Sequence, residues 1–318
     1  MFAKLTTARY GGMAILAIFI TVLPLFLPNI YYYDVAIRIG ISGIVVVGLN
    51  LLIGYAGQIS LGHAGFFGLG AYTTGILTSR YGFPSLLALT AGVTLVGIIA
   101  FVLARPILRL SGHYLAMATL GLGIIISIVI TNEGWLTGGP DGMGVPPFSV
   151  LGWEIHGEKN WYWVIGALLL LTVWLALNII DSPPGRAARA VHGSEVAAQV
   201  VGVDTAGSKV LLFVLSAILA SMMGSLSAHY SGFITPTQSG FFHSIELVTM
   251  VVLGGMASTF GAVIGAAILI LLPQLLTSLH DYEMVVLGLI LMVTLIFMPK
   301  GLVPTLVSGL RHLARGNR

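Results

Sequence analysis

The sequence has no cysteine and few charged residues. Without cysteine, the 318-residue chain forms no disulfide and uses no thiol chemistry. Asp, Glu, Lys and Arg make up only 8% of the residues, whereas a soluble domain carries about 25%. Apolar and aromatic residues make up 57%. A soluble chain of this composition would have too few polar side chains to cover its surface, so the composition predicts a membrane protein.

The motifs of several enzyme classes are also missing. The chain has no Gly-x4-Gly-Lys-Ser/Thr phosphate-binding loop, no His-Glu-x-x-His zinc motif and no other clear metal-ligand or nucleophile–base spacing in its apolar stretches. We therefore expect no catalytic residue, no metal site and no cofactor in this chain. The net charge of +3 is small, and we expect no nucleic-acid partner.

Ten apolar stretches predict an all-α, polytopic membrane bundle that forms one domain over residues 1–318. A membrane-spanning helix needs about 20 residues. The predicted stretches are 11–30, 35–53, 62–79, 84–104, 113–132, 161–180, 209–229, 244–257, 261–279 and 283–298. The first follows Lys4 and Arg9, as in a signal peptide, but Pro24 and Pro28 lie where a cleavage site needs small residues. We therefore expect this stretch to be retained as a span.

Basic residues in the loops predict the orientation, because Lys and Arg are enriched in cytoplasmic loops. With ten spans and a cytoplasmic N-terminus, residues 181–208 are internal, residues 133–160 are external and both termini are cytoplasmic. Eleven of the 14 basic residues are then internal, namely Lys4, Arg9, Arg105, Arg109, Arg186, Arg189, Lys209, Lys300, Arg311, Arg315 and Arg318. The external loop is instead acidic and rich in tryptophan.

A polar interruption separates the second and third stretches. Residues 54–63 combine glycine and alanine with Gln58, Ser60 and His63. Backbone that leaves a helix inside a membrane must be buried in protein or face water, and transporters often place the solute path at broken helices. The segment is therefore either part of a solute path or a plain cytoplasmic turn, and the sequence leaves both open. Residues 254–261 form a similar interruption, which is weak evidence for an internal repeat.

Charge within the apolar stretches is scarce. Glu246 lies near the outer end of the eighth stretch, where it attracts a substrate ammonium group, pairs within the bundle or lies at the interface. Arg38 lies near the outer end of the second stretch, and we expect its side chain to extend outward. The candidate residues of the solute path are Asn50, Gln58, Ser60, His63 and Glu246.

The longest predicted internal loop contains a helix. Ser182 is a suitable N-cap and Pro183 a suitable first residue for a helix whose body is residues 186–201. Gly202 then ends the helix, and Asp204 can cap the next span. A short helix tied to spans on both sides suits docking to a partner protein. The alternative is a surface helix that has no partner.

Three segments resemble the permease subunits of branched-chain amino acid importers of the ATP-binding-cassette (ABC) type. Residues 195–202 resemble the Glu-Ala-Ala-x3-Gly loop of ABC importer permeases, with Val196 in place of the first alanine. Residues 50–68 and the turn at 137–142 are similar to the branched-chain amino acid permeases in particular. The likeness runs over nearly the whole chain and favours the M-type subunit over its H-type partner.

The resemblance implies a type II-like permease fold in the inner membrane of a bacterium. It also implies two separate ATP-binding subunits, a second, related permease and a periplasmic solute-binding protein that docks to the outer loop 133–160. The residues that would couple the chain to the ATPase are Arg186, Arg189, Glu195, Ala197, Ala198 and Gly202. The solute stays open, because urea, amide and aromatic-acid importers use similar permeases. The choice between a homodimer and a heterodimer stays open too, although the family favours the heterodimer.

The alternative function is that of an ion-coupled secondary transporter. Such carriers often hold acidic residues or histidines within their spans. Here only Glu246 qualifies, with His63, His229 and His243 near the ends of spans. The ABC importer is therefore the stronger interpretation.

Overall fold

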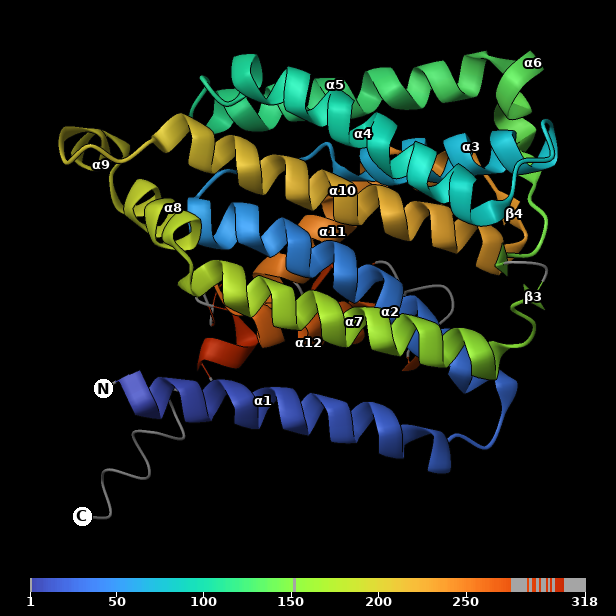
Figure 1. The fold of residues 1–318 in the computed structure, drawn as a ribbon, viewed down its shortest axis with the longest axis horizontal. Helices are drawn as coiled ribbons and strands as arrows, with labels where there is room; N and C mark the ends of the chain where they lie inside the picture. The colour runs from blue at the N-terminus through green and yellow to red at the C-terminus, as the bar shows by residue number, and fades with distance from the viewer. Residues whose placement is uncertain are drawn as a thin grey trace.

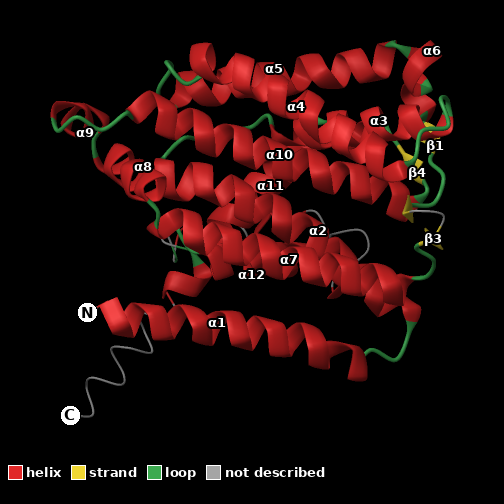
Figure 2. Ribbon diagram, viewed as in Figure 1, coloured by secondary structure: helices red, strands yellow, loops and turns green. Residues whose placement is uncertain are grey.

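The computed structural model describes residues 2–150 and 153–275, a few single positions between 285 and 298, and residues 301–305. Long helices run side by side along the bundle (Figure 1, Figure 2). They are α1 (Phe2–Val22), α2 (Ile30–Asn50), α3 (His63–Ser79), α4 (Ser85–Ile107), α5 (His113–Asn132), α7 (Glu158–Asp181), α10 (Thr205–Ser231), α11 (Phe241–Gly254) and α12 (Thr259–Leu275).

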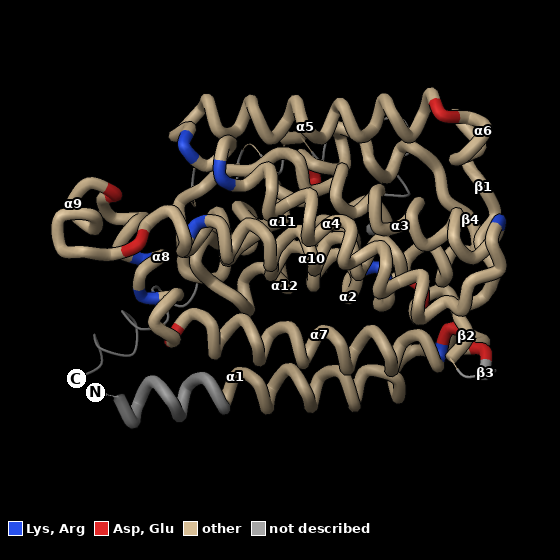
Figure 3. The backbone as a smooth tube through the Cα atoms, turned by 45° about the horizontal axis from the view of Figure 1, so that its top comes forward, with Lys and Arg blue, Asp and Glu red and all other residues tan. Residues whose placement is uncertain are grey.

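Shorter elements join these helices. The helical ones are η1 (Leu23–Leu25), the π-helical turn η2 (Leu51–Tyr55), α6 (Gly134–Thr137), η3 (Gly139–Asp141), α8 (Pro183–Gly193), α9 (Glu195–Val200) and η4 (Pro236–Ser239). Among the strands, β1 (Met143–Gly144) pairs antiparallel with β4 (Phe233–Ile234), and β2 (Ser149–Val150) pairs antiparallel with β3 (Trp153–Glu154). These strands lie at the end of the bundle opposite α8 and α9 (Figure 1, Figure 3). We call the two ends the strand end and the α8–α9 end.

The centre of the bundle is α10, which packs against α2, α3 and α4. Small residues let α3 and α10 approach closely, because a Cβ at Gly70 would collide with Ser221 and a Cβ at Gly224 would collide with the backbone of Phe67. Helix α1 lies at one edge of the bundle beside α7, and α5 lies at the opposite edge (Figure 1). The outer faces of α4 and α5 expose large apolar side chains, as expected of helices that face lipid.

The predicted all-α membrane fold is confirmed. Within the described residues, five helical segments are long and apolar enough to cross a membrane, namely Ile30–Tyr55, Ser85–Ile107, His113–Asn132, Glu158–Asp181 and Thr205–Ser231. Three shorter apolar helices are Gly11–Leu25, Phe241–Gly254 and Thr259–Gln274. The total of ten spans stays a prediction, and the tenth predicted stretch, 283–298, lies outside the continuously described residues.

The first two helices begin earlier than the sequence predicted. Helix α1 covers Phe2–Val22, whereas the predicted stretch was 11–30. Helix α2 begins at Ile30 rather than at residue 35, directly after its N-cap residue Asn29. The polar and aromatic residues at the start of α2 made the apolar stretch look shorter than the helix.

Candidate functional site

The chain leaves helical structure after α2, within the glycine-rich segment 54–63 that the sequence singled out. Helix α2 first widens into the π-helical turn η2, and residues 57–62 are not helical. Gly57 has φ +68°, a conformation that favours glycine. Single π-helical turns next to α-helices are frequent at functional sites. The break therefore has a defined geometry, set by the wide turn and one left-handed glycine.

Asn50 ties this break to the second interruption. Its Nδ2 donates a hydrogen bond to Ser258 O (2.9 Å), and its Oδ1 accepts one from Ala257 N (3.0 Å). Asn50 is only 1% exposed, and a Cβ at Gly54 would collide with Ala257 N. The two similar interruptions in the sequence therefore lie against each other, and both polar groups of Asn50 hold them together.

Ser60 and His63 form a buried chain of polar groups with Ser216 of α10. Ser60 Oγ lies 3.0 Å from His63 Nδ1, and His63 Nε2 lies 2.8 Å from Ser216 Oγ. The Ser216 hydroxyl donates to Phe213 O (2.9 Å), so it accepts from Nε2 while Nδ1 accepts from Ser60. All three polar residues are at most 1% exposed. In this structure they connect the start of α3 to the central helix.

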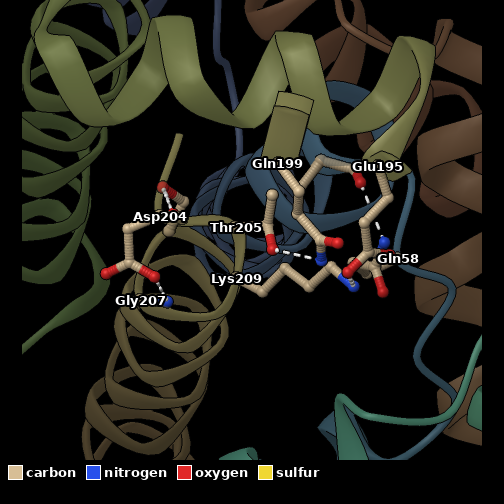
Figure 4. Close-up of polar contacts among 9 residues, drawn as sticks. Gln58, Glu195, Gln199, Asp204, Thr205, Gly207 and Lys209 are labelled. Atoms are coloured by element: carbon tan, nitrogen blue, oxygen red, sulfur yellow. Dashed lines mark hydrogen bonds and ion pairs between the residues drawn. The ribbon is translucent and has the colours of Figure 1, made fainter. Parts of the chain in front are cut away.

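Gln58 lies at the α8–α9 end of the bundle. Figure 4 shows its side chain beside Glu195 and Lys209. The neighbouring Gly57 faces α8, since a Cβ on this glycine would lie 3.1 Å from His192 Nδ1. The break after α2 therefore contacts the segment that the sequence predicted to couple the chain to a partner.

The ends of that segment are formed as predicted. Ser182 Oγ accepts a hydrogen bond from Gly185 N (3.5 Å) at the start of α8. Gly202 has φ +81° and follows α9. Asp204 Oδ1 accepts from Gly207 N (2.9 Å) at the start of α10. These local capping contacts fix where the segment leaves α7 and where it enters α10.

The expected single helix over residues 186–201 is wrong. Helix α8 ends at Gly193 and α9 begins at Glu195, with Ser194 extended between them (φ −163°, ψ 114°). Ser194 Oγ accepts a hydrogen bond from Ala197 N (3.3 Å). The serine therefore caps a new helix instead of continuing the first one.

Two side chains of α9 are tied to the first turns of α10 (Figure 4). Glu195 Oε1 forms an ion pair with Lys209 Nζ (2.5 Å), and Gln199 Nε2 donates to Thr205 Oγ1 (3.1 Å). Lys209 is only 3% exposed. Glu195, one of the predicted coupling residues, therefore pairs with Lys209 of its own chain.

The other predicted coupling residues divide into exposed and buried ones. Arg186, Arg189 and Ala197 are exposed and available to a partner. Ala198 is 4% exposed and packs within the chain. Among the predicted coupling residues, Ala198 therefore faces its own bundle, and its part in coupling stays a prediction.

The sequence analysis missed three exposed valines on the same segment. Val196, Val200 and Val201 are 72%, 81% and 77% exposed. Val196 and Val200 are four residues apart and so lie on one side of α9. The available signal was apolar β-branched residues at this spacing in an otherwise polar loop.

Glu246 lies elsewhere, in a cavity of about 530 Å³. The cavity lies between residues 38–45 of α2, residues 243–250 of α11 and the last turns of α10 and α12, toward the strand end. Phe67 of α3 and Gln238 of η4 also line it. Arg38, Tyr230 and His243 line it together with Glu246, and Glu246 Oε2 lies 3.1 Å from His243 Nδ1. The other four predicted path residues do not line this cavity. The predicted path residues therefore form two separate groups.

Comparison with protein families identifies the class of protein. The model of the permease component of branched-chain amino acid transport systems matches residues 31–295. The chain belongs to this permease family. The predicted function as a membrane transport permease of an ABC importer is therefore confirmed.

Individual relatives agree with this assignment. The permease is 32% identical to the high-affinity branched-chain amino acid transport system permease protein LivM of Escherichia coli (strain K12), over 85% of this chain and 69% of LivM. It is 28% identical to LivH of Salmonella typhimurium, over 81% of this chain and 90% of LivH. It is 24% identical to BraD of Pseudomonas aeruginosa, over 87% of this chain and 97% of BraD. No solved structure matches this permease.

Proposed function

We propose that this permease is one of two related membrane subunits of an ATP-driven importer for branched-chain amino acids or similar small solutes. ATP is hydrolysed by two separate ATP-binding subunits, and a periplasmic binding protein delivers the solute to the loop 133–160. The chain lies in a bacterial inner membrane with both termini in the cytoplasm. LivM and LivH are both named as permease proteins of a high-affinity branched-chain amino acid system, which supports a pair of related permeases.

The connection of α9 to α10 is the observation that carries this proposal. An ATPase in water must pass its motion to helices within the membrane, and this requires a structured segment that is fixed to those helices. The pair between Glu195 and Lys209 joins α9 to the central helix, and so does the hydrogen bond between Gln199 and Thr205. Helix α8 in turn contacts the break after α2. A displacement of the α8–α9 segment therefore acts on α10 and on the break together.

The exposed valines supply a docking surface on this segment. Large apolar side chains on a water-exposed surface are unfavourable, and burial of one such side chain contributes about 1.5–3 kcal/mol. A partner that covers Val196, Val200 and Val201 gains this contribution from each of them. Arg186 and Arg189 are exposed on the adjacent α8, where they can pair with acidic residues of the same partner.

The distribution of charge supports the proposed orientation. In the described part of the chain, basic residues gather mainly at the α8–α9 end, whereas acidic residues lie at both ends, on and beside α8 and α9 and also near α6 and β3 (Figure 3). The basic residues concerned are Arg105, Arg109, Arg186, Arg189 and Lys209. Because Lys and Arg are enriched on the cytoplasmic side, the α8–α9 end is the cytoplasmic one and ATPase docking takes place there.

Val200→Asp tests the docking surface in the reconstituted importer. The aspartate removes apolar area and places a charge where the partner must exclude water. We expect normal insertion of the permease but at least about tenfold weaker binding of the ATPase, with a matching loss of uptake. Tyr81→Asp adds the same charge at an exposed position of the α3–α4 turn, outside both proposed docking segments, and serves as the control. If Val200→Asp binds the ATPase and imports solute like the unchanged protein, docking takes place elsewhere.

A further inference from the structure

The cavity near the strand end carries charges of both signs over an apolar wall. Arg38 of α2 and Glu246 of α11 line it from different helices. Ile245, Ile270 and Pro273, which are partly or largely exposed, contribute the accessible apolar surface. Its volume of about 530 Å³ lies within the range of small-molecule sites. The cavity therefore has the size and the lining of a site for a small ligand that is charged at one end and apolar at the other.

The guanidinium group of Arg38 is held in place with its outer nitrogens available. Its Nε donates to Asp34 Oδ2 (2.8 Å), and Asp34 Oδ1 accepts from the hydroxyl of Tyr230 (2.6 Å). The terminal nitrogens of Arg38 have no hydrogen-bond partner in the described part of the chain, and the side chain is 61% exposed. A guanidinium group fixed through Nε still presents two NH₂ groups, which suit a carboxylate.

Arg38 lies two turns inside α2 rather than in its first turn. Arg38 lies about 12 Å beyond the start of α2, at about 1.5 Å per residue. A charge at this depth is unfavourable against lipid, and intramembrane charges usually face a partner or a water-filled space. Arg38 faces both, because Asp34 holds it at the wall of the cavity.

Glu246 presents the opposite charge from α11. Its side chain is 58% exposed, with His243 Nδ1 3.1 Å from one carboxylate oxygen. In the described part of the chain no ion pair joins Glu246 to Arg38, although both line the same cavity. Gln238 adds a second acceptor, since its Oε1 is buried without a hydrogen-bond partner among the described residues and the residue lines the cavity. The two acceptors suit an ammonium group, which has only donors.

We propose that this cavity binds a free α-amino acid with an aliphatic side chain. The carboxylate bonds to the terminal nitrogens of Arg38 and the ammonium group to Glu246 and Gln238. The side chain packs on Ile245, Ile270 and Pro273. Such a ligand pairs both charges of the cavity at once, which offsets the unfavourable removal of its own charges from water. An uncharged solute such as urea pairs neither charge. The proposal rests on the proposed importer function and narrows its substrate to zwitterions.

Cysteine protection tests the site, because the chain has no cysteine of its own. Thr249→Cys places a single thiol in the cavity wall, and the complete reconstituted importer is labelled with a water-soluble maleimide from the binding-protein side. We expect L-leucine to slow labelling several-fold. Three other compounds should not slow labelling. They are leucinamide, which lacks the carboxylate; 4-methylpentanoate, which lacks the ammonium group; and urea. Tyr81→Cys, at an exposed position of the α3–α4 turn, is the control and should label at the same rate with every compound.

Charge-removing variants in the Thr249→Cys background test the two roles. Glu246→Gln and Arg38→Gln are each expected to raise the leucine concentration for half protection about tenfold or more, since each removes a charge-assisted contact. Arg38→Gln also removes the ion-pair partner of Asp34, which can prevent assembly. Glu246 has an exposed side chain, so Glu246→Gln is the decisive variant if Arg38→Gln does not assemble. Equal protection by leucinamide or 4-methylpentanoate, or unchanged protection in Glu246→Gln, would overturn the site. A thiol that reacts in the isolated permease but not in the complex would show that the second permease fills the cavity.

Uptake by the same reconstituted importer separates this site from the proposed function. Leucine uptake without leucine protection of Thr249→Cys rejects the cavity as a binding site and leaves the importer function intact. Absence of ATP-dependent uptake of any amino acid rejects the function itself.

Discussion

Replacement of Asn50 tests whether the two breaks of the bundle depend on each other. Asn50 joins η2 to the loop between α11 and α12 through Ala257 N and Ser258 O, over more than 200 positions of sequence. Asn50→Leu keeps a side chain of similar length but has neither a donor nor an acceptor. The backbone N–H of Ala257 then loses its partner, next to a position where Asn50 itself is 1% exposed. The carbonyl of Ser258 keeps the hydrogen bond that it accepts from Ala262 N (2.9 Å).

The magnitude follows from the one orphaned group, the N–H of Ala257. A donor that loses its partner without gaining another costs about 1–3 kcal/mol, so Asn50→Leu is expected to lower the free energy of unfolding by about 1–3 kcal/mol. Ala257 adds to this sensitivity, because its φ of +59° is left-handed and costs a non-glycine residue about 1–2 kcal/mol. The hydrogen bond from Ala257 N to Asn50 helps to hold that conformation. Ala257→Gly should accordingly raise stability by about 1 kcal/mol.

Thermal unfolding of the purified permease in lipid nanodiscs measures this effect, with uptake by the reconstituted importer as a second readout. Asn178→Leu is the matched control, because it removes an exposed asparagine of α7 and should change stability by less than about 0.5 kcal/mol. An unfolding temperature for Asn50→Leu equal to that of Asn178→Leu would refute the reasoning, because the two breaks would then be held by backbone packing alone.

Three further predictions concern the α8–α9 end. Lys209→Met removes the buried partner of Glu195 and should lower solute uptake per ATP while ATP hydrolysis stays intact. Glu195→Gln keeps an acceptor for Lys209 and should have a smaller effect. Reconstituted ATPase and uptake assays measure the ratio of uptake to hydrolysis, and an unchanged ratio in Lys209→Met would show that α9 couples by another route. Gly202→Pro should abolish coupling, because proline requires φ near −65° whereas Gly202 has φ +81°. Proline also lacks the N–H that Gly202 donates to Gln199 O (3.0 Å). Gly202→Asn, in which asparagine tolerates the left-handed conformation, should retain most uptake, and equal activity of the two variants would contradict this explanation. For the topology, cysteines introduced at the exposed positions Ser194 and Lys159 should be labelled only from the cytoplasm and only from outside, respectively, and labelling of position 194 in intact cells would reverse the proposed orientation.

Local sequence chemistry predicted the parts of the structure that depend on neighbouring residues. Ser182, Gly202 and Asp204 end or begin helices as expected, because a cap needs only its own side chain and the next three backbone groups. The break at 54–63 was also visible, since glycine and polar residues interrupt an apolar run. The break at Ser194 carried the same kind of signal, a serine before a run of helix-forming residues, but the continuous helix-compatible composition around it obscured the cap.

Contacts between distant segments were not predictable from one sequence. Nothing near Glu195 indicates that Lys209 returns to it once α10 begins, and nothing near Asn50 indicates Ala257 as its partner. The candidate path residues show the consequence. Polar character marked Ser60 and Glu246 equally. The packing of α3 on α10 buries Ser60, and the meeting of several helices forms the cavity around Glu246.

ATP dependence of uptake tests the central claim most directly. The permease is reconstituted into proteoliposomes with the second permease, the ATP-binding subunits and the binding protein, and uptake of radiolabelled L-leucine is followed with and without ATP and with a protonophore. An ATP-driven importer that couples through the α8–α9 segment predicts uptake that requires ATP, is insensitive to the protonophore and is lost in Val200→Asp. Uptake that proceeds without ATP and is abolished by the protonophore would contradict the account and establish an ion-coupled carrier instead.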